Sequence, residues 1–252
     1  MEIKRVSGGE FRLDGGSMFG VVPKVLWERH FPADELNRIR MNTNCVLVKT
    51  ALATVLIDTG YGTAASPKQR KRMAMSEGTP LLDNLAQVGV ARDDIDLVIL
   101  THLHFDHVGG CTYRDSEGAL RPTFPRAKHV VQNAEWKDAV ADLPELRGAY
   151  SAKELQLLAD ADLIQVVDGK KEVTQGISVE PTGGHTRGHQ VVVLDGQDVQ
   201  AIYISELCPT TAHLHIYWTM AYDQDLLQVR RAKRQLLDQA VVSRQLVLFN
   251  HD

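Results

Sequence analysis

The stretch Val98–Gly110, "VILTHLHFDHVGG", places three histidines and an aspartate within six residues, directly after an apolar run. That apolar run is typical of a buried strand. Residues two apart on an extended chain point the same way, so His102 and His104 are expected to converge on one ion. The chain then bends toward a helix predicted to begin near Asp106. This bend is expected to turn Asp106 and His107 toward a second ion.

The residue types in this stretch favour metal chemistry. Imidazole nitrogens and carboxylate oxygens are the ligands that zinc and similar divalent ions prefer. Histidines satisfied by hydrogen bonds in the core are the alternative, which the spacing H-x-H-x-D-H disfavours. Two ions need more ligands than one stretch supplies. Ligand-type residues follow other apolar runs and are expected to gather at one sheet edge: His185 and His189 in "PTGGHTRGH", Glu206 after "AIYIS", and His251 after the last strand.

Composition limits the class of protein. The chain has 252 residues without a low-complexity linker or a short repeat, so we expect one domain over residues 1–252. The net charge of −4 gives no indication of a nucleic-acid or anionic-membrane partner. No apolar run approaches eighteen residues, and "MEIKRVSGGEF" lacks the apolar segment of a secretory signal. Three widely spaced cysteines do not suggest a disulfide framework, which favours a cytoplasmic location.

Strand-like and helix-like segments alternate along the chain. The patterns predict a hairpin of two strands, further strands and several helices. The absence of G-x-G-x-x-G after the first strand, together with the hairpin, favours sheets covered by helices over a doubly wound nucleotide fold. The predicted strands are 45–49, 54–58, 96–100, 129–133, 177–181, 191–194, 199–204 and 245–250, and the predicted helices are 79–89, 151–159 and 225–241.

Four motifs together resemble the metallo-β-lactamase superfamily: "THLHFDHVGG", "GGHTRGH", a carboxylate after "AIYIS" and the late histidine in "FNHD". The stretches "LDGGSMFGVVPKVLW" and "PTTAHLHIYWTMAYD" also resemble the branch that contains quorum-quenching N-acyl homoserine lactone lactonases. The resemblance covers almost the whole chain. It implies an α/β fold, the αβ/βα four-layer sandwich of two mixed sheets with outer helices, with metals at the edge of the sandwich.

The resemblance also implies the metal ligands. It assigns one ion to His102, His104 and His185, and a second ion to Asp106, His107 and His251. Two divalent ions, zinc first, are expected, although the same ligands accept manganese, iron, cobalt or nickel. Glu206 stands where the family usually has a bridging aspartate. Asp58, in "LIDTG", and His189 are expected to support the ligands from behind rather than to bind the ions.

The chain departs from the family pattern at two positions. Glu206 is one methylene longer than aspartate, so bridging both ions, binding one ion, or loosening the second site all stay open. Some lactonases of the superfamily have a tyrosine shortly after this carboxylate, where this chain has Cys208 and Pro209; His213 or Tyr217 are the candidates to replace it. His251 is also one residue from the end of the sequence, where family members usually continue, so a missing C-terminal tail stays open.

The reaction that the resemblance implies is hydrolytic opening of a lactone ring by a metal-bridging hydroxide. Asp106 is the expected catalytic residue, which binds the second ion and relays a proton to the leaving oxygen. The substrate is expected to be a small-molecule ester or lactone. The residues expected to contact it, each with ordinary core packing or a structural role as the alternative, are Met18, Phe19, Trp27, Phe105, His213 and Trp218.

Other functions compete with this interpretation. The same metal pair serves hydrolysis of phosphotriesters or other esters, whereas thioester and β-lactam cleavage fit the branch motifs less well. A metal-dependent ligand-binding protein with weak turnover is the non-enzymatic alternative, suggested by Glu206 and the short C-terminus. The acyl-chain preference and the oligomeric state, including a homodimer, are left open by the sequence.

Overall fold

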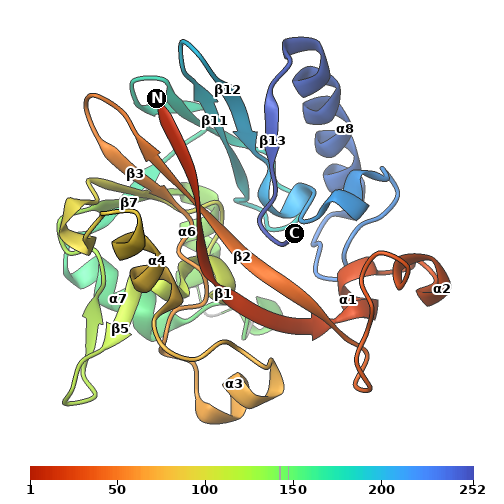
Figure 1. The fold of residues 1–252 in the computed structure, drawn as a ribbon, viewed down its shortest axis with the longest axis horizontal. Coiled ribbons are helices and arrows are strands. Elements are labelled where there is room, and N and C mark those ends of the chain that lie inside the picture. The colour runs from red at the N-terminus through yellow and green to blue at the C-terminus, as the bar shows by residue number, and fades with distance from the viewer. Residues whose placement is uncertain (142, 147) are drawn as a thin grey trace.

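Two mixed sheets face each other in the computed structural model, which describes residues 1–141, 143–146 and 148–252 (Figure 1). The six-stranded sheet has the order β1 (Glu2–Asp14), β2 (Arg38–Lys49), β3 (Thr54–Ile57), β4 (Leu97–Ile99), β7 (Lys128–Gln132) and β8 (Ile164–Val167). The five-stranded sheet has the order β13 (Leu246–Leu248), β12 (Gln200–Tyr203), β11 (Gln190–Asp195), β10 (Ile177–Pro181) and β9 (Lys171–Thr174). A separate small hairpin joins β5 (Thr112–Arg114) to β6 (Leu120–Pro122).

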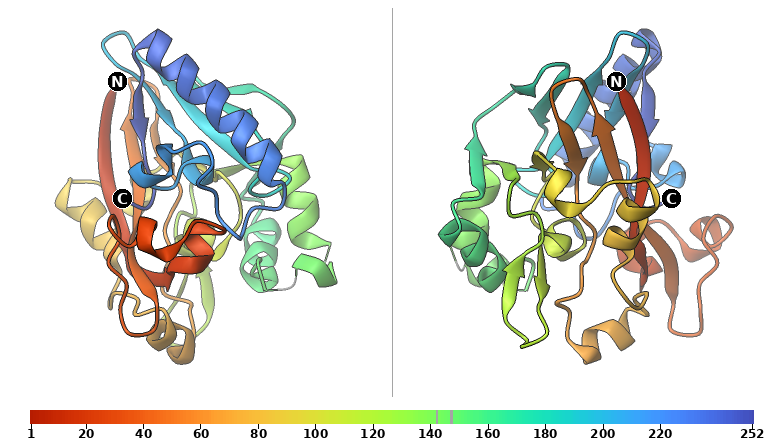
Figure 2. Two further views of the ribbon diagram at one scale, coloured as in Figure 1. Left: turned by 90° about the vertical axis from the view of Figure 1, so that its right-hand side faces the viewer. Right: turned by 60° about the vertical axis from the view of Figure 1, so that its left-hand side comes forward.

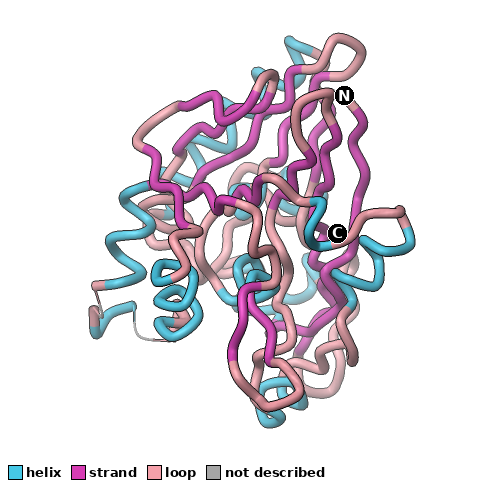
Figure 3. Tube along the Cα trace, turned by 90° about the vertical axis from the view of Figure 1, so that its left-hand side faces the viewer, coloured by secondary structure: helices cyan, strands magenta, loops and turns pink. Residues whose placement is uncertain are grey.

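Helices lie outside the two sheets (Figure 3). They are α1 (Gly15–Phe19), α2 (Lys24–Trp27), α3 (Pro67–Arg72), α4 (Pro80–Gln87), α5 (Phe105–Val108), α6 (Asn133–Val140), α7 (Ala152–Asp160) and α8 (Leu226–Ser243). The long helix α8 runs along the outside of the five-stranded sheet (Figure 2). None of the helices in the described residues has both the length and the apolar character needed to cross a membrane.

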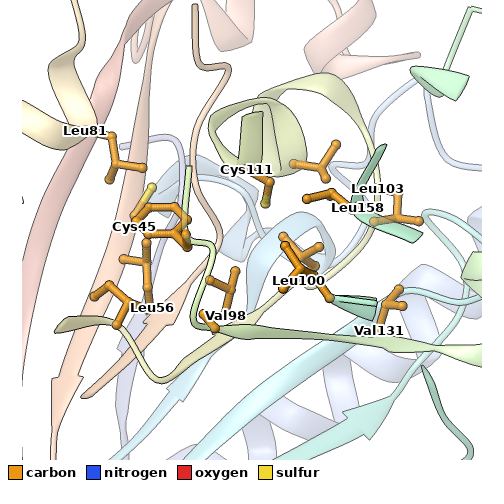
Figure 4. Close-up of a cluster of buried hydrophobic side chains, with 14 of the residues drawn as sticks. Cys45, Leu56, Leu81, Val98, Leu100, Leu103, Cys111, Val131 and Leu158 are labelled. Atoms are coloured by element: carbon orange, nitrogen blue, oxygen red, sulfur yellow. The ribbon is translucent and has the colours of Figure 1, made fainter. Parts of the chain in front are cut away.

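Three apolar layers explain why these elements stack. Between the sheets, Val48 and Val55 pack in one cluster with Val179 and Val192. Behind the six-stranded sheet, the cluster in Figure 4 joins its strands to α4, α6 and α7. Behind the five-stranded sheet, a third cluster joins its strands to α8. Each fully buried aliphatic side chain contributes about 1.5–3 kcal/mol, so these layers hold the αβ/βα sandwich together.

Most of the predicted elements are confirmed. β2 and β3 form the predicted antiparallel hairpin, with Val46 opposite Ile57. α8 begins at Leu226, where the Asp225 side chain caps the helix by accepting from the Gln228 backbone N–H. The long strand β1 was not predicted from the sequence. Its segment "EIKRVSGGEFRLD" is rich in charges, and its pairing with β2 shifts between Ser7 and Glu10.

The topology brings distant strand ends together. β3 and β4 are parallel neighbours in one sheet, and β12 and β13 are parallel neighbours in the other. The segments that follow these four strands carry Asp58, the 101–107 stretch, Glu206 and His251. Because carboxyl ends of parallel strands meet at the same edge, the candidate metal ligands gather at one edge of the sandwich.

Candidate metal centre

Six side chains form two neighbouring sets at this edge. The first set is His102, His104 and His185, and the second set is Asp106, His107 and His251. Within each set, the candidate ligand atoms lie within 4.8 Å of one another. The rings of His102 and His107, one from each set, have their centres 4.1 Å apart. The structure thus groups the six residues in the two sets that the resemblance implies.

The first set fits a metal ion because its imidazoles converge and two of them, those of His102 and His104, are unprotonated. His102 is fully buried, and its Nε2 has no hydrogen-bond partner among the described residues. Burial and the imidazole of His185 lower the pKa of His104 to about 3. His185 Nε2 and His104 Nδ1 face each other at 3.0 Å. Unprotonated imidazole nitrogens that converge without other partners suit a divalent cation.

The second set mixes imidazoles with carboxylates. Asp106 Oδ2 lies 3.4 Å from His251 Nε2. Although burial alone would lower it, Glu206 and Asp106 raise the pKa of His251 to about 10. Burial alone would likewise raise the pKa of Asp106, but His107 and His251 lower it below its usual value. Buried acidic groups around imidazoles are also a donor set that fits a divalent cation.

Glu206 lies against the second set. Its Oε1 is 2.8 Å from His251 Nε2 and 3.2 Å from His107 Nε2, and it also accepts from the Asn250 side chain. Against the effect of burial, His251 and His107 lower the pKa of this carboxyl well below its usual value. The longer side chain therefore keeps a charged oxygen at the second set, and among the described residues no hydrogen bond or ion pair joins this carboxylate to the first set.

The outer nitrogens of two ligand histidines meet carboxylates. His107 Nδ1 lies 2.7 Å from Asp58 Oδ2, and His185 Nδ1 lies 2.9 Å from Asp223 Oδ1. A carboxylate behind a histidine sets the tautomer and direction of the ring. Asp58 is the supporting residue expected from the sequence, whereas Asp223 was not foreseen. Nothing in the spacing around Asp223 marks it as such a residue.

Thr101 is hydrogen-bonded to two residues that lie beside the candidate ligands. Asp58 accepts from the Thr101 backbone N–H at 2.8 Å, and Ser205 Oγ lies 2.9 Å from Thr101 Oγ1. Both Asp58 (φ +55°) and Ser205 (φ +49°) have left-handed backbone conformations, which are costly for residues other than glycine. Such strain persists only where surrounding contacts over-determine it, and here those contacts hold the residues beside the candidate ligands.

His189 and His251 are held from behind as well. His189 Nε2 accepts the Glu206 backbone N–H at 3.3 Å, while its Nδ1 lies 2.7 Å from Thr182 Oγ1. Burial lowers the pKa of His189 well below its usual value, so this ring is neutral. His251 Nδ1 lies 2.6 Å from the Asn42 carbonyl oxygen. His189 therefore fixes the backbone at Glu206 rather than joining either set.

A cavity of about 350 Å³ opens above the two sets. All seven candidate ligands, Glu206 included, line it. The other described lining residues are largely apolar: Leu13, Met18, Met73, Phe105, Glu145, Leu146, Gly148, Ala149, Met220, Tyr222 and Gln224.

Four of the six expected substrate contacts lie behind the cavity wall. Met18 and Phe105 line the cavity as expected, but Phe19, Trp27, His213 and Trp218 do not. Phe19 is stacked between other rings, with its centre 5.4 Å from Trp27 and 4.7 Å from His213, and Trp218 packs edge-on against it. Phe19, Trp27 and His213 are buried, and Trp218 packs partly buried against the same aromatic cluster, so the structure shows the packing given as their alternative, and contact with a substrate stays a prediction.

The missing tyrosine is not replaced by either candidate. His213 Nε2 lies 2.9 Å from the Met18 carbonyl oxygen, and Tyr217 is 69% exposed beside Arg230. Tyr222 instead lines the cavity from the segment between β12 and α8. It lies in "PTTAHLHIYWTMAYD", the stretch that resembles the lactonase branch, but only the folded chain distinguishes it from the other aromatic residues there.

Comparisons with known proteins agree with this geometry. The family described as "Metallo-beta-lactamase superfamily" matches residues 38–200. Among curated proteins, an N-acyl homoserine lactonase of Bacillus sp. is 28% identical over 162 residues, which are 60% of this chain and 57% of that protein. A probable metallo-hydrolase of Mycobacterium tuberculosis is 25% identical over 209 residues, 71% of this chain and 63% of that protein. The matches span only 57–63% of the length of these relatives.

Solved structures share the whole fold. A probable metal-dependent hydrolase from Staphylococcus aureus superposes with a TM-score of 0.92 at 32% identity, covering 100% of this chain and 89% of that one. The dizinc quorum-quenching lactonase AidC, in complex with a product, superposes with a TM-score of 0.78 at 21% identity, covering 99% and 90%. The expected four-layer sandwich is thus confirmed.

Proposed function

We propose that this chain, which belongs to the metallo-beta-lactamase superfamily of metal-dependent hydrolases, opens the lactone ring of N-acyl homoserine lactones. One observation carries the proposal: a cavity of about 350 Å³ is lined by seven candidate ligands together with largely apolar residues. A lactone ester would lie at the ligands while its acyl chain lies against the wall. The similarity to lactonases of Bacillus supports this substrate class.

Two divalent ions, zinc first, would be held by the two sets, with Glu206 at the second. When bound, such ions supply a water-derived nucleophile at neutral pH and polarise the ester carbonyl. The chain's own residues then orient the substrate and move the proton.

Asp106 is the residue placed to move that proton. It is 8% exposed, lines the cavity, and has a lowered pKa, so its carboxylate is ionised at neutral pH. The carboxylate can accept a proton from the attacking water and deliver it to the ring oxygen as the carbon–oxygen bond breaks. The balance is one lactone and one water giving one hydroxy acid, whose carboxyl group releases a proton at neutral pH.

Apolar residues would hold the acyl chain. Met18, Met73, Phe105 and Met220 contribute unbranched or aromatic surface to the wall. Methionine side chains adapt to flexible apolar ligands. Tyr222 brings a hydroxyl-bearing side chain into the same cavity, where it can donate to a carbonyl oxygen of the substrate.

The test is ring opening of a medium-chain N-acyl homoserine lactone, followed by a pH indicator, with metal-loaded and chelated protein side by side. Metal-dependent turnover far above that with a simple aryl ester is the expected result. A protein that holds two ions but opens no lactone would contradict the substrate, and a phosphotriester assay would then follow. Ligand binding without turnover would favour the metal-dependent binding protein instead.

A further inference from the structure

Glu135, on the first turn of α6, connects the two loops that carry the first set. Its Oε1 accepts the backbone N–H of Leu103 at 2.9 Å, and its Oε2 accepts the hydroxyl of Thr186 at 2.6 Å. Leu103 lies between His102 and His104, and Thr186 directly follows His185. One carboxylate therefore spans the two segments from which all three histidines of the first set come.

The Glu135 carboxylate is buried in the protein interior, where an ionised group costs free energy. Glu135 and Thr186 are both 0% exposed, and no salt bridge to Glu135 is present among the described residues. Burial raises the pKa of Glu135, while the hydrogen bonds from Thr186 and Leu103 oppose that rise. Burying such a carboxyl costs free energy unless its oxygens are hydrogen-bonded, and here each oxygen accepts one hydrogen bond from a ligand segment.

Two further contacts hold the 185–189 loop, which carries His185, against α6. Arg187 Nε donates to Asp138 Oδ2 at 2.8 Å, one helical turn beyond Glu135. Gly188 lies so close to the helix that a Cβ atom there would overlap the Glu135 backbone. The helix thus supports the 185–189 loop at three consecutive residues, and only Glu135 also reaches the 102–104 segment.

We infer that Glu135 is a positioning residue for the first metal site, acting by holding the Leu103 amide and the Thr186 hydroxyl at a set separation. Among the described residues, Glu135 makes no hydrogen bond to a ligand side chain and does not line the cavity, so it acts through the backbone of the ligand segments. The inference rests on the proposed function only in requiring that the first set binds an ion.

The test measures metal binding in addition to turnover. Zinc bound per chain is determined by equilibrium dialysis at a series of free zinc concentrations. Each Glu135 variant is repeated with His251→Ala, where the second set lacks a ligand and the remaining ion reports the first set. The rise in Tm on zinc addition is recorded as well, since an ion that binds only the folded state raises Tm.

Glu135→Ala should weaken zinc binding at the first set by about 10- to 100-fold, as loss of a supporting contact typically does. Glu135→Gln should stay within about twofold of the wild type, because its amide keeps an acceptor for Leu103 and can donate to Thr186. Asp138→Ala, the matched control on the same helix, should also stay within about twofold. In the double variant with Glu135→Ala, Thr186→Val should reduce zinc affinity by less than it does alone, because both substitutions remove the same hydrogen bond.

Three results would overturn the inference. The first is a zinc affinity of Glu135→Ala equal to that of the wild type. The second is a loss of zinc affinity in Glu135→Gln as large as that in Glu135→Ala. The third is a loss of zinc affinity in Asp138→Ala as large as that in Glu135→Ala. A merely structural role would lower Tm equally with and without zinc and leave the zinc-dependent rise unchanged. If Glu135→Ala does not fold, Thr186→Val decides, since unchanged zinc affinity there also overturns the inference.

The proposed function can fail independently. A wild-type protein that binds two ions but opens no lactone would contradict the substrate, while the dialysis result would still decide the role of Glu135.

Discussion

The two ligand sets lie side by side and share the stretch after β4, but each takes its remaining ligand from a different segment, and they differ in charge. The first set consists of three histidines on two loops that α6 joins through Glu135. The second set draws on the chain after β4 and after β13, with Asp58, Asn42 and Glu206 around it. The first set holds histidines alone and takes its third ligand from the 185–189 loop, whereas the second set includes a carboxylate and takes its third ligand from the chain after β13.

This difference indicates how each set tolerates change. At the first set, burial keeps the pKa of His104 at about 3 and the pKa of His102 well below its usual value, so both rings are unprotonated. At the second set, carboxylates compensate each buried histidine. Loss of a supporting residue should therefore displace ligands at the first set and leave uncompensated charge at the second.

The largest expected effect follows from removing one ligand of each set. His185→Ala and His251→Ala should each lose one bound ion and reduce lactone turnover by more than about 100-fold, the upper end for loss of a supporting contact alone. Metal analysis and the pH-indicator assay measure both quantities. Two ions retained in either variant would contradict the division into two sets.

The next largest effect is expected from removing the charge of either supporting carboxylate, Asp58 or Asp223. Asp58→Asn and Asp223→Asn each keep the shape and remove the charge behind one ligand histidine. Both should lower metal affinity by about 10- to 100-fold. Asp58→Asn should be the more severe, because Asp58 also accepts from the Thr101 backbone N–H and hydroxyl. The opposite ranking in zinc titrations would show that the first set depends more on charge than the second.

The segment between β12 and α8, which carries Asp223 to the first set, can be tested through Lys233, which is hydrogen-bonded to it. Its buried Nζ donates to the carbonyl oxygens of His213, His215 and Trp218, and burial lowers its pKa to about 8. The unfolded chain therefore binds more protons than the folded chain between pH 8 and 10.5, and this contribution to stability grows as pH rises.

Between these pH values, the free energy of unfolding of the wild type should rise relative to that of Lys233→Met by about 2–3 kcal/mol. Urea titrations of both proteins at several pH values measure the difference. Parallel pH profiles of the two proteins would contradict it.

The smallest expected effect concerns the cavity wall. Met220→Ala should raise KM for a medium-chain lactone about fivefold, equivalent to about 1 kcal/mol of lost apolar contact, without changing the number of bound ions. Leu214→Ala is the matched control, since Leu214 lies on the same segment, is 46% exposed and does not line the cavity. If Met220→Ala changed the number of bound ions, the cavity wall would also affect metal binding at the first set, which would contradict this expectation.

The sequence by itself determined the ligand motifs and most of the elements that flank them. The stretch after β4 and the histidine pair of "HTRGH" are local patterns, since a strand followed by a tight turn orients neighbouring side chains without help from the rest of the chain. The helix α8 and the hairpin of β2 and β3 follow from periodicity in the same way. The resemblance to the superfamily, now confirmed, rested on these local motifs.

Only the tertiary structure decided which other residues surround the ligands. Glu135, Asp223 and Tyr222 come from segments far along the chain from the histidines they approach or the cavity they line. Phe19 and Trp27 are residue types found in substrate pockets, but both are buried here, with Phe19 stacked between Trp27 and His213. Side-chain direction at such positions depends on which neighbours exclude water, and that is settled by the packing of the whole sandwich.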